Sequence, residues 1–180
     1  MKQKNPVQAG PEWRETNIRE FPGSPSERIG TGWMLITAGD GAGWNTMTAS
    51  WGGLGVLWGR DVAFMFIRPS RFTYQFANSS PLFSLSFFDE SHRNALNICG
   101  AKSGRDIDKA AEAGLTPIVF GVTGAIGFKE AREIIVCRKL YTHDFDPAQF
   151  LDPTSIEKNY GGKDYHRMFI GEILSLLVKT

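Results

Sequence analysis

The sequence is short of cysteine and histidine, and this scarcity limits the kinds of site that it can build. Only two cysteines, Cys99 and Cys137, occur among the 180 residues, and neither belongs to a Cys-x-x-Cys or a Cys/His metal-binding pattern. We expect both to be small buried hydrophobic residues. The three histidines, His92, His143 and His166, are far apart and form no His-Glu-x-x-His motif, so the sequence predicts no metal site.

Net charge and long apolar runs are also lacking. The 20 basic and 19 acidic residues leave a formal charge of +1, which argues against binding of nucleic acid or of an acidic membrane through bulk charge. The apolar runs are short and interrupted, so no transmembrane helix is expected. Residues 1–6 show no apolar signal-peptide region, and we therefore expect a cytoplasmic location.

The sequence does contain enough apolar side chain for one domain with a sizeable core. Hydrophobic residues make up 42% of the chain, which includes 13 phenylalanines and 5 tryptophans. Residues 1–30 are polar and are interrupted by four prolines, so they predict an N-terminal arm that wraps the body of the protein or is partly mobile. Residues 31–180 then form the domain itself.

The hydrophobic pattern of the domain predicts a mainly β fold, an antiparallel barrel that is closed or nearly closed and has a few short helices. Strands are predicted over 33–38, 44–51, 62–67, 82–88, 133–141 and 166–178. Helices are predicted over 71–78, 91–99 and 103–113, the last from the capping-box spacing of Ser103 and Asp106. Residues 54–58 are expected to be a loop, 118–129 an irregular strand or loop, and 142–163 a long excursion of the kind that is often functional or interfacial.

Three polar clusters are candidates for a binding site. Residues 45–53 carry an amide, three hydroxyls, an indole and two glycines at the end of a predicted strand, which is unusual for a plain core strand and suggests a polar ligand. The alternative is an edge strand with solvated hydroxyls, and this stretch alone favours the edge strand. Residues 68–74 place two arginines beside Ser70, the predicted cap of a helix, which indicates an anion site or simply a solvated helix start. Residues 100–106 include Lys102, which contacts a ligand or merely flanks a helix cap.

Several common nucleotide-binding and catalytic motifs are absent. No Gly-x-Gly-x-x-Gly follows a predicted strand, so a Rossmann nicotinamide site is not supported. No Walker A, Gly-x-Ser-x-Gly or kinase motif occurs either.

Five segments together resemble one family. They are N-T-M-T-A-S-W at 45–51, I-R-P-S-R-F-T-Y at 67–74, S-L-S-F-F-D at 84–89, C-G-A-K-S-G-R-D at 99–106 and H-R-M-F-I-G-E at 166–172. Each is weak alone, but in this order and spacing they resemble the flavin reductase-like family of FMN-binding split-barrel proteins. The resemblance runs from about Ile29 to the C-terminus and leaves the first thirty residues outside.

The resemblance implies a homodimeric split β-barrel that holds FMN near the subunit interface and reduces flavin with NADH or NADPH by hydride transfer. By position, it implies that the flavin is lined by Asn45, Met47, Thr48, Ala49, Ser50 and Trp51. It implies that Arg68, Arg71 and Thr73 lie at or near the phosphate, and that Lys102, Ser103 and Gly104 approach the ring or ribityl chain. His166 corresponds to a family histidine near the ring and is the expected catalytic residue.

The residues are chemically suited to FMN. Hydroxyls and arginines can hold its phosphate, and Trp51 can form a flat wall for its ring. Two alternatives stay open. One is a flavin-bound electron carrier that does not itself oxidise NAD(P)H. The other is a split barrel that binds a different ligand such as haem, with His92, His143 or His166 as an axial ligand, although no haem motif supports it.

Overall fold

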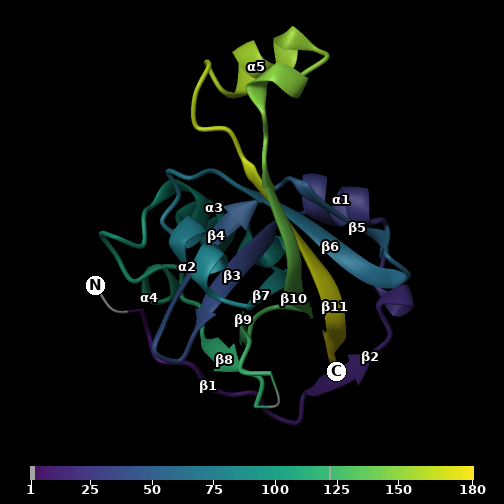
Figure 1. Ribbon diagram of the computed structural model, residues 1–180. Helices are drawn as coiled ribbons and strands as arrows, with labels where there is room; N and C mark the ends of the chain where they lie inside the picture. The colour runs from purple at the N-terminus through teal and green to yellow at the C-terminus, as the bar shows by residue number, and fades with distance from the viewer. Residues whose placement is uncertain (1–2, 122) are drawn as a thin grey trace.

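The computed structural model describes residues 3–121 and 123–180 and consists mainly of antiparallel β-sheet (Figure 1). Seven strands of the large sheet lie in the order β4-β3-β7-β10-β11-β6-β5, and β2 pairs with β11 beside this path. Their bounds are β2 Trp13–Thr16, β3 Met34–Asp40, β4 Gly43–Ala49, β5 Gly52–Leu57, β6 Arg60–Ile67, β7 Leu82–Phe87, β10 Glu133–Asp144 and β11 Arg167–Lys179. The predicted antiparallel, mainly β fold is confirmed.

The two end strands of this sheet, β4 and β5, are neighbours in the chain. Only Ser50 and Trp51 connect the end of β4 to the start of β5. The sheet must therefore curl until its two ends approach each other at this corner, although β4 and β5 are not hydrogen-bonded partners in the order of the sheet. The result is a barrel that stays open between its two end strands, β4 and β5.

The core fills both sides of the curled sheet. Because side chains alternate along a strand, Ile135 of β10 joins the cluster inside the barrel with Met34, Phe87 and Phe169, while its neighbour Ile134 joins the outer cluster. Short elements cover the outer cluster: α3 Arg93–Ala101, α4 Lys109–Glu112, β8 Pro117–Val119 and β9 Ile126–Phe128. Cys99 lies in the outer cluster and Cys137 in the inner one, and burial raises the pKa of both thiols.

The N-terminal segment runs along the barrel and contributes to its sheets. β1 Val7–Gln8 pairs with β8, β2 pairs with β11, and η1 Ile18–Glu20 and α1 Pro25–Gly30 follow. Arg28 of α1 forms an ion pair with the buried Glu133 of β10. Burial raises the pKa of Glu133, and Arg28 opposes that shift. Met1 and Lys2 of the predicted arm, and Val122 of the predicted 118–129 segment, lie outside the described residues.

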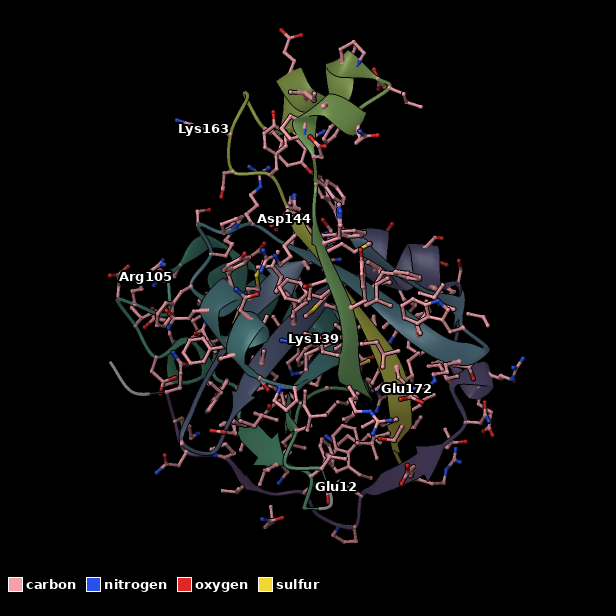
Figure 2. All side chains as sticks on the ribbon, in the orientation of Figure 1. Glu12, Arg105, Lys139, Asp144, Lys163 and Glu172 are labelled. Atoms are coloured by element: carbon pink, nitrogen blue, oxygen red, sulfur yellow. The ribbon has the colours of Figure 1, made fainter. Side chains whose placement is uncertain are left out.

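A long excursion, residues 145–166, connects β10 to β11 and projects from one end of the barrel (Figure 1). It contains η3 Pro147–Gln149 and α5 Pro153–Asn159, in agreement with the predicted excursion. Asp144 lies at its base, where Arg167 donates two hydrogen bonds of 2.6 Å to the Asp144 carboxylate. Figure 2 shows Asp144 at this base and Lys163 on the projecting part.

Residues 54–58 were predicted to be a loop, and this prediction is wrong. Gly52–Leu57 forms β5, which pairs with β6 along its whole length. The glycines suggested a loop, but pairing with a neighbouring strand overrode their weak local preference.

The predicted starts of all three helices are also wrong. α2 is Thr73–Ser79, and the hydroxyl of Ser70 bonds the Asp164 carboxylate instead of capping it. Residues 90–92 form the 3-10 helix η2 before α3 begins at Arg93. Ser103 and Asp106 form a turn, and α4 is capped by Asp108, whose carboxylate accepts from the Ala111 N–H. None of the helices among the described residues is long and apolar enough to cross a membrane.

Candidate functional site

A cleft lies at the corner where the barrel does not close. Met47, Thr48 and Ala49 come from the end of β4, and Arg68 follows the end of β6. The antiparallel pairing of Ile67 with Arg167 brings His166, the residue before β11, next to this position. Sheet register therefore brings Arg68 and His166 together, although nearly one hundred positions separate them in the sequence.

The cleft consists of two adjoining pockets. The first, which we call the aromatic pocket, has a volume of about 220 Å³ and is lined by Met47, Thr48, Ala49, Ser50, Trp51, Phe66, Arg68, Arg71 and His166. The second, the basic pocket, has a volume of about 330 Å³ and is lined by Met47, Arg68, Ser70, Arg71, Phe72, Thr73, Ala101, Lys102, Ser103, Arg105, Lys109 and Asp164. Met47, Arg68 and Arg71 line both, so the two pockets are neighbouring parts of the cleft.

His166 forms part of one wall of the aromatic pocket. Its ring lies 4.9 Å from the ring of Trp51 between centroids, and its Nδ1 lies 2.9 Å from the hydroxyl of Tyr160. Burial lowers the pKa of His166 to about 4, and the nearby Arg68 acts in the same direction. The imidazole is therefore neutral at pH 7.

The basic pocket concentrates positive charge. Arg68, Arg71, Lys102, Arg105 and Lys109 line it, and Asp164 is the acidic residue in its lining. Several of these cations are held by the protein. The Arg71 guanidinium donates to Gly100 O (3.3 Å), and the Arg105 guanidinium donates to Ser70 O (3.3 Å) and lies over the ring of Phe72. A pre-positioned group of cations of this kind suits an anionic ligand.

Lys109 is the most buried cation of the basic pocket. Its Nζ donates to Thr46 O at 2.9 Å and to Cys99 O at 2.7 Å, and the residue is only 4% exposed. Burial lowers the pKa of Lys109 to about 8, which the neighbouring Arg71 supports. An ammonium has three N–H donors, so one remains for a ligand in the pocket.

The carboxylate of Asp164 accepts hydrogen bonds inside the basic pocket as an anionic ligand would. It accepts from the backbone N–H of Ser70 at 3.0 Å and from the Ser70 hydroxyl at 2.6 Å. Asp164 lies on the return leg of the excursion, where its backbone has a φ of 57°. The loop that follows β6 thus already offers two hydrogen-bond donors to a negative group.

Two predicted site residues, Asn45 and Gly104, lie behind the cleft and do not line it. Asn45 is fully buried, and its Nδ2 donates to the hydroxyl of Thr73 at 2.8 Å. A Cβ added at Gly104 would lie 2.1 Å from Asn45 Oδ1. The two residues therefore pack against each other and hold β4, α2 and the loop after α3 together.

The structure brings the other predicted residues to the cleft, although several hydroxyls and charges already have protein partners. The Thr48 hydroxyl donates to Leu96 O, and the Thr73 hydroxyl accepts from Asn45. The Lys102 ammonium donates to the Glu112 carboxylate at 2.5 Å, and Ser103 Oγ accepts from the Arg105 N–H. For these residues, the hydrogen bond or ion pair with the protein fixes the orientation of the side chain at the pocket.

Some residues of the cleft are not predicted from the sequence. Lys109 and Asp164 lie outside the three polar clusters, and nothing in their neighbourhood in sequence distinguishes them from surface charges. Arg105 lies within the third polar cluster, residues 100–106, so the sequence could have identified it as a candidate site residue. Of the other histidines, His92 precedes α3 against Phe88, and His143 lies on β10 against Tyr141. Across residues 3–121 and 123–180, no group of three or more His, Cys, Asp or Glu side chains is arranged to hold a metal ion.

One comparison with known proteins identifies the family of the chain. The family model described as "Flavin reductase like domain" matches residues 26–180. A search of curated proteins finds no match.

Solved structures with the same fold include an FMN-binding domain of a flavin reductase-like enzyme from Shewanella baltica, with a TM-score of 0.66 and 12% identity over 93% of this chain and 77% of that chain. Flavoredoxin from Methanosarcina acetivorans gives a TM-score of 0.63 and 20% identity over 81% of this chain and 67% of that one. A putative flavin reductase with a split barrel domain from Shewanella frigidimarina gives a TM-score of 0.65 and 19% identity over 82% of this chain and 67% of that one. At these identities the likeness establishes the split-barrel fold.

Proposed function

The chain belongs to the flavin reductase-like family, and on that basis we propose that its corner cleft binds FMN and that the protein is an NAD(P)H-dependent flavin reductase. The observation that carries the proposal is that the two pockets adjoin and share Met47, Arg68 and Arg71 in their linings. FMN has a dianionic phosphate at one end and a flat, largely apolar ring at the other. One pocket rich in cations that adjoins one lined by aromatic side chains suits both ends of such a molecule.

The donor set of the basic pocket fits a phosphate. Arginine and lysine side chains supply positive charge and N–H donors, and the loop at Ser70 already binds a carboxylate through a backbone N–H and a hydroxyl. We propose that Arg68, Arg71 and Thr73 hold the phosphate, and that Lys102 and Ser103 contact the ribityl chain or the ring. Asn45 and Gly104 pack behind the residues that line the basic pocket. This role differs from the direct contact with the flavin that the family resemblance implies.

The aromatic pocket fits the ring. Trp51 offers an indole face that is 42% exposed, and Met47, Ala49 and Phe66 supply apolar surface. When bound there, FMN supplies the redox chemistry by accepting a hydride from NADH or NADPH. This chain contributes binding and orientation. Arg68 and Arg71 favour negative charge in the cleft, and His166, neutral at pH 7, offers a hydrogen bond at its wall.

A flavin-bound electron carrier remains the second candidate. The fold is shared with a protein named flavoredoxin, and the exposed Trp51 leaves the cleft approachable by a partner protein. The two candidates differ in one property, since only the reductase oxidises NAD(P)H by itself.

We also propose a homodimer. Large apolar side chains are exposed on β5, β10, β11 and the turn after β5, namely Val56, Trp58, Tyr141 and Leu174. The rings of Trp58 and Tyr141 lie 6.4 Å apart, so two of these side chains already form one patch. A second copy of the chain would remove this surface from water. Sedimentation of the wild type as a dimer and of Trp58→Asp as a monomer is the expected result, and a monomeric wild type would contradict the proposal.

A cytoplasmic location belongs to the same proposal. Cys99 and Cys137 are both free, as is usual in a reducing compartment, and a nicotinamide donor is available there.

The visible absorption spectrum of the purified protein, recorded without oxygen before and after addition of NADH and then NADPH, tests the function. A flavin spectrum that bleaches with either nucleotide is expected. A flavin spectrum that neither nucleotide bleaches would favour the electron carrier. A colourless protein that does not take up added FMN would overturn the proposed cofactor.

A further inference from the structure

One side chain of the excursion contacts the histidine of the aromatic pocket. Tyr160 is the residue at the C-terminal end of α5, and its hydroxyl lies 2.9 Å from His166 Nδ1. Both residues are buried, at 7% and 8% exposure. Arg68 fixes this part of the excursion, because its guanidinium donates to Asn159 O at 2.6 Å and lies over the Tyr160 ring.

The phenol of Tyr160 can donate to His166 Nδ1 or accept from it, so the direction of this hydrogen bond and the tautomer of His166 determine each other. Burial raises the pKa of Tyr160, so its O–H is retained at neutral pH. Among the described residues, Nδ1 is the acceptor that this hydroxyl reaches, which favours the phenol as the donor. A neutral imidazole carries one N–H, and when Nδ1 accepts, the proton resides on Nε2.

His166 Nε2 is available to the cleft. Within the described part of the chain it makes no recorded hydrogen bond, and it is absent from the buried polar atoms without a partner. The nitrogen is therefore reached by solvent, and His166 lines the aromatic pocket. The ring is also held from its sides, with Trp51 at 4.9 Å and Phe145 at 6.5 Å between centroids, so it has little freedom to turn over.

We propose that Tyr160 is a positioning residue that fixes His166 as the Nε2–H tautomer, so that the histidine presents a hydrogen-bond donor, and no base, to the aromatic pocket. This inference deepens the proposed function and rests on it for the identity of the ligand. The chemistry that such a donor recognises is a carbonyl oxygen or a nitrogen lone pair at the edge of a flat ring, and it recognises that group more strongly when the ring carries negative charge.

The tautomer can be measured on the protein without any flavin. Two-bond ¹H–¹⁵N correlation spectra of ¹⁵N-labelled protein distinguish a protonated ring nitrogen from an unprotonated one. In the wild type we expect Nε2 to give the protonated shift and Nδ1 the unprotonated shift. In Tyr160→Phe both nitrogens should move toward the averaged shifts of two exchanging tautomers.

Tyr165→Phe is the matched control. The Tyr165 ring packs 4.9 Å from that of Tyr160, but its hydroxyl makes no recorded hydrogen bond among the described residues, so the His166 shifts should stay as in the wild type. A protonated Nδ1 in the wild type, or unchanged shifts in Tyr160→Phe, would overturn the proposal. Equal changes in both variants would also overturn it, because they would indicate general loosening of the excursion.

A second measurement links the tautomer to the ligand. In the FMN-loaded protein, Tyr160→Phe should slow reduction by NAD(P)H by about fivefold, the size expected for the loss of one well-aligned hydrogen bond. The FMN dissociation constant should change by less than about twofold. A normal rate with the altered tautomer would overturn the role of the donor. If the protein binds no FMN, the proposed function fails, whereas the spectra without flavin still decide the tautomer.

Discussion

The Nζ of Lys109 donates a hydrogen bond to the carbonyl oxygen of Thr46, 2.9 Å away, and so ties α4 to the strand that forms one wall of the cleft. A second bond from the same nitrogen reaches Cys99 O near the end of α3. Three segments that are separate in the sequence thus depend on one buried ammonium.

Lys109→Met should destabilise the protein by about 1–3 kcal/mol at pH 7, because two buried carbonyl groups lose their donor. The pKa of Lys109 is about 8 in the folded protein against a usual value of 10.5. Between these pH values the unfolded chain binds the extra proton, so the wild type should gain stability relative to the variant as pH rises from 8 to 10.5. Urea unfolding of both proteins at several pH values measures this difference. If the difference in stability between the two proteins does not change with pH, the lowered pKa of Lys109 is contradicted.

Gly104→Ala should destabilise the protein by about 1–3 kcal/mol, because the new methyl group would overlap the fully buried amide of Asn45. Asn45 is held by its bond to Thr73, so it cannot simply move aside. The affinity for FMN should fall as well. Gly30→Ala is the control, since a Cβ at that position meets no atom within 4 Å. Thermal unfolding and FMN titration of both variants test the prediction, and equal behaviour would refute it.

Arg68→Ala should weaken FMN binding by about tenfold or more, because the variant removes charge-assisted hydrogen bonds to the phosphate. Its guanidinium lines both pockets, so no other residue can take over its position fully. Arg60→Ala, at the other end of β6 and ion-paired with Glu172, should bind FMN as the wild type does. Fluorescence titration with FMN gives both affinities. An unchanged affinity in Arg68→Ala would rule out its proposed role.

His166→Ala should lower NAD(P)H oxidation more than it lowers FMN binding, since the histidine lies at the wall of the aromatic pocket and outside the basic pocket. Steady-state oxidation of NADH and NADPH, together with FMN titration, separates the two effects. Unchanged oxidation in the variant would exclude a catalytic role. His166→Gln should retain more activity than His166→Ala, because an amide can still donate a hydrogen bond into the pocket.

His166 should titrate far below the usual histidine range, because its burial lowers the pKa to about 4 from a usual value of 6.5. As the pH falls from 6.5 to 4, the unfolded chain takes up a proton that folded His166 resists, so His166 lowers the free energy of unfolding across that window. An NMR titration of the His166 ring protons measures the midpoint directly. A midpoint near 6.5 would show that the ring is not shielded as the structure indicates.

The sequence alone determined the class of fold and the positions of most of its strands. The alternation of Phe83, Leu85 and Phe87 with serines, and the β-branched run at 134–136, are local patterns that a strand must have whatever its partners. It also identified three polar clusters, and the site residues predicted within them, except for Asn45 and Gly104, line the cleft.

The tertiary structure alone decided which groups complete the site. Lys109 and Asp164 reach the cleft from α4 and from the excursion, and Tyr160 contacts His166 from the excursion. No local pattern in the sequence marks these three residues. Ser70 looked like a helix cap until a carboxylate 94 residues away proved to be its partner. Periodicity is a property of neighbouring residues, whereas hydrogen-bond partners and burial depend on strand register and on how the chain returns to the barrel. These are fixed only when the whole domain has folded.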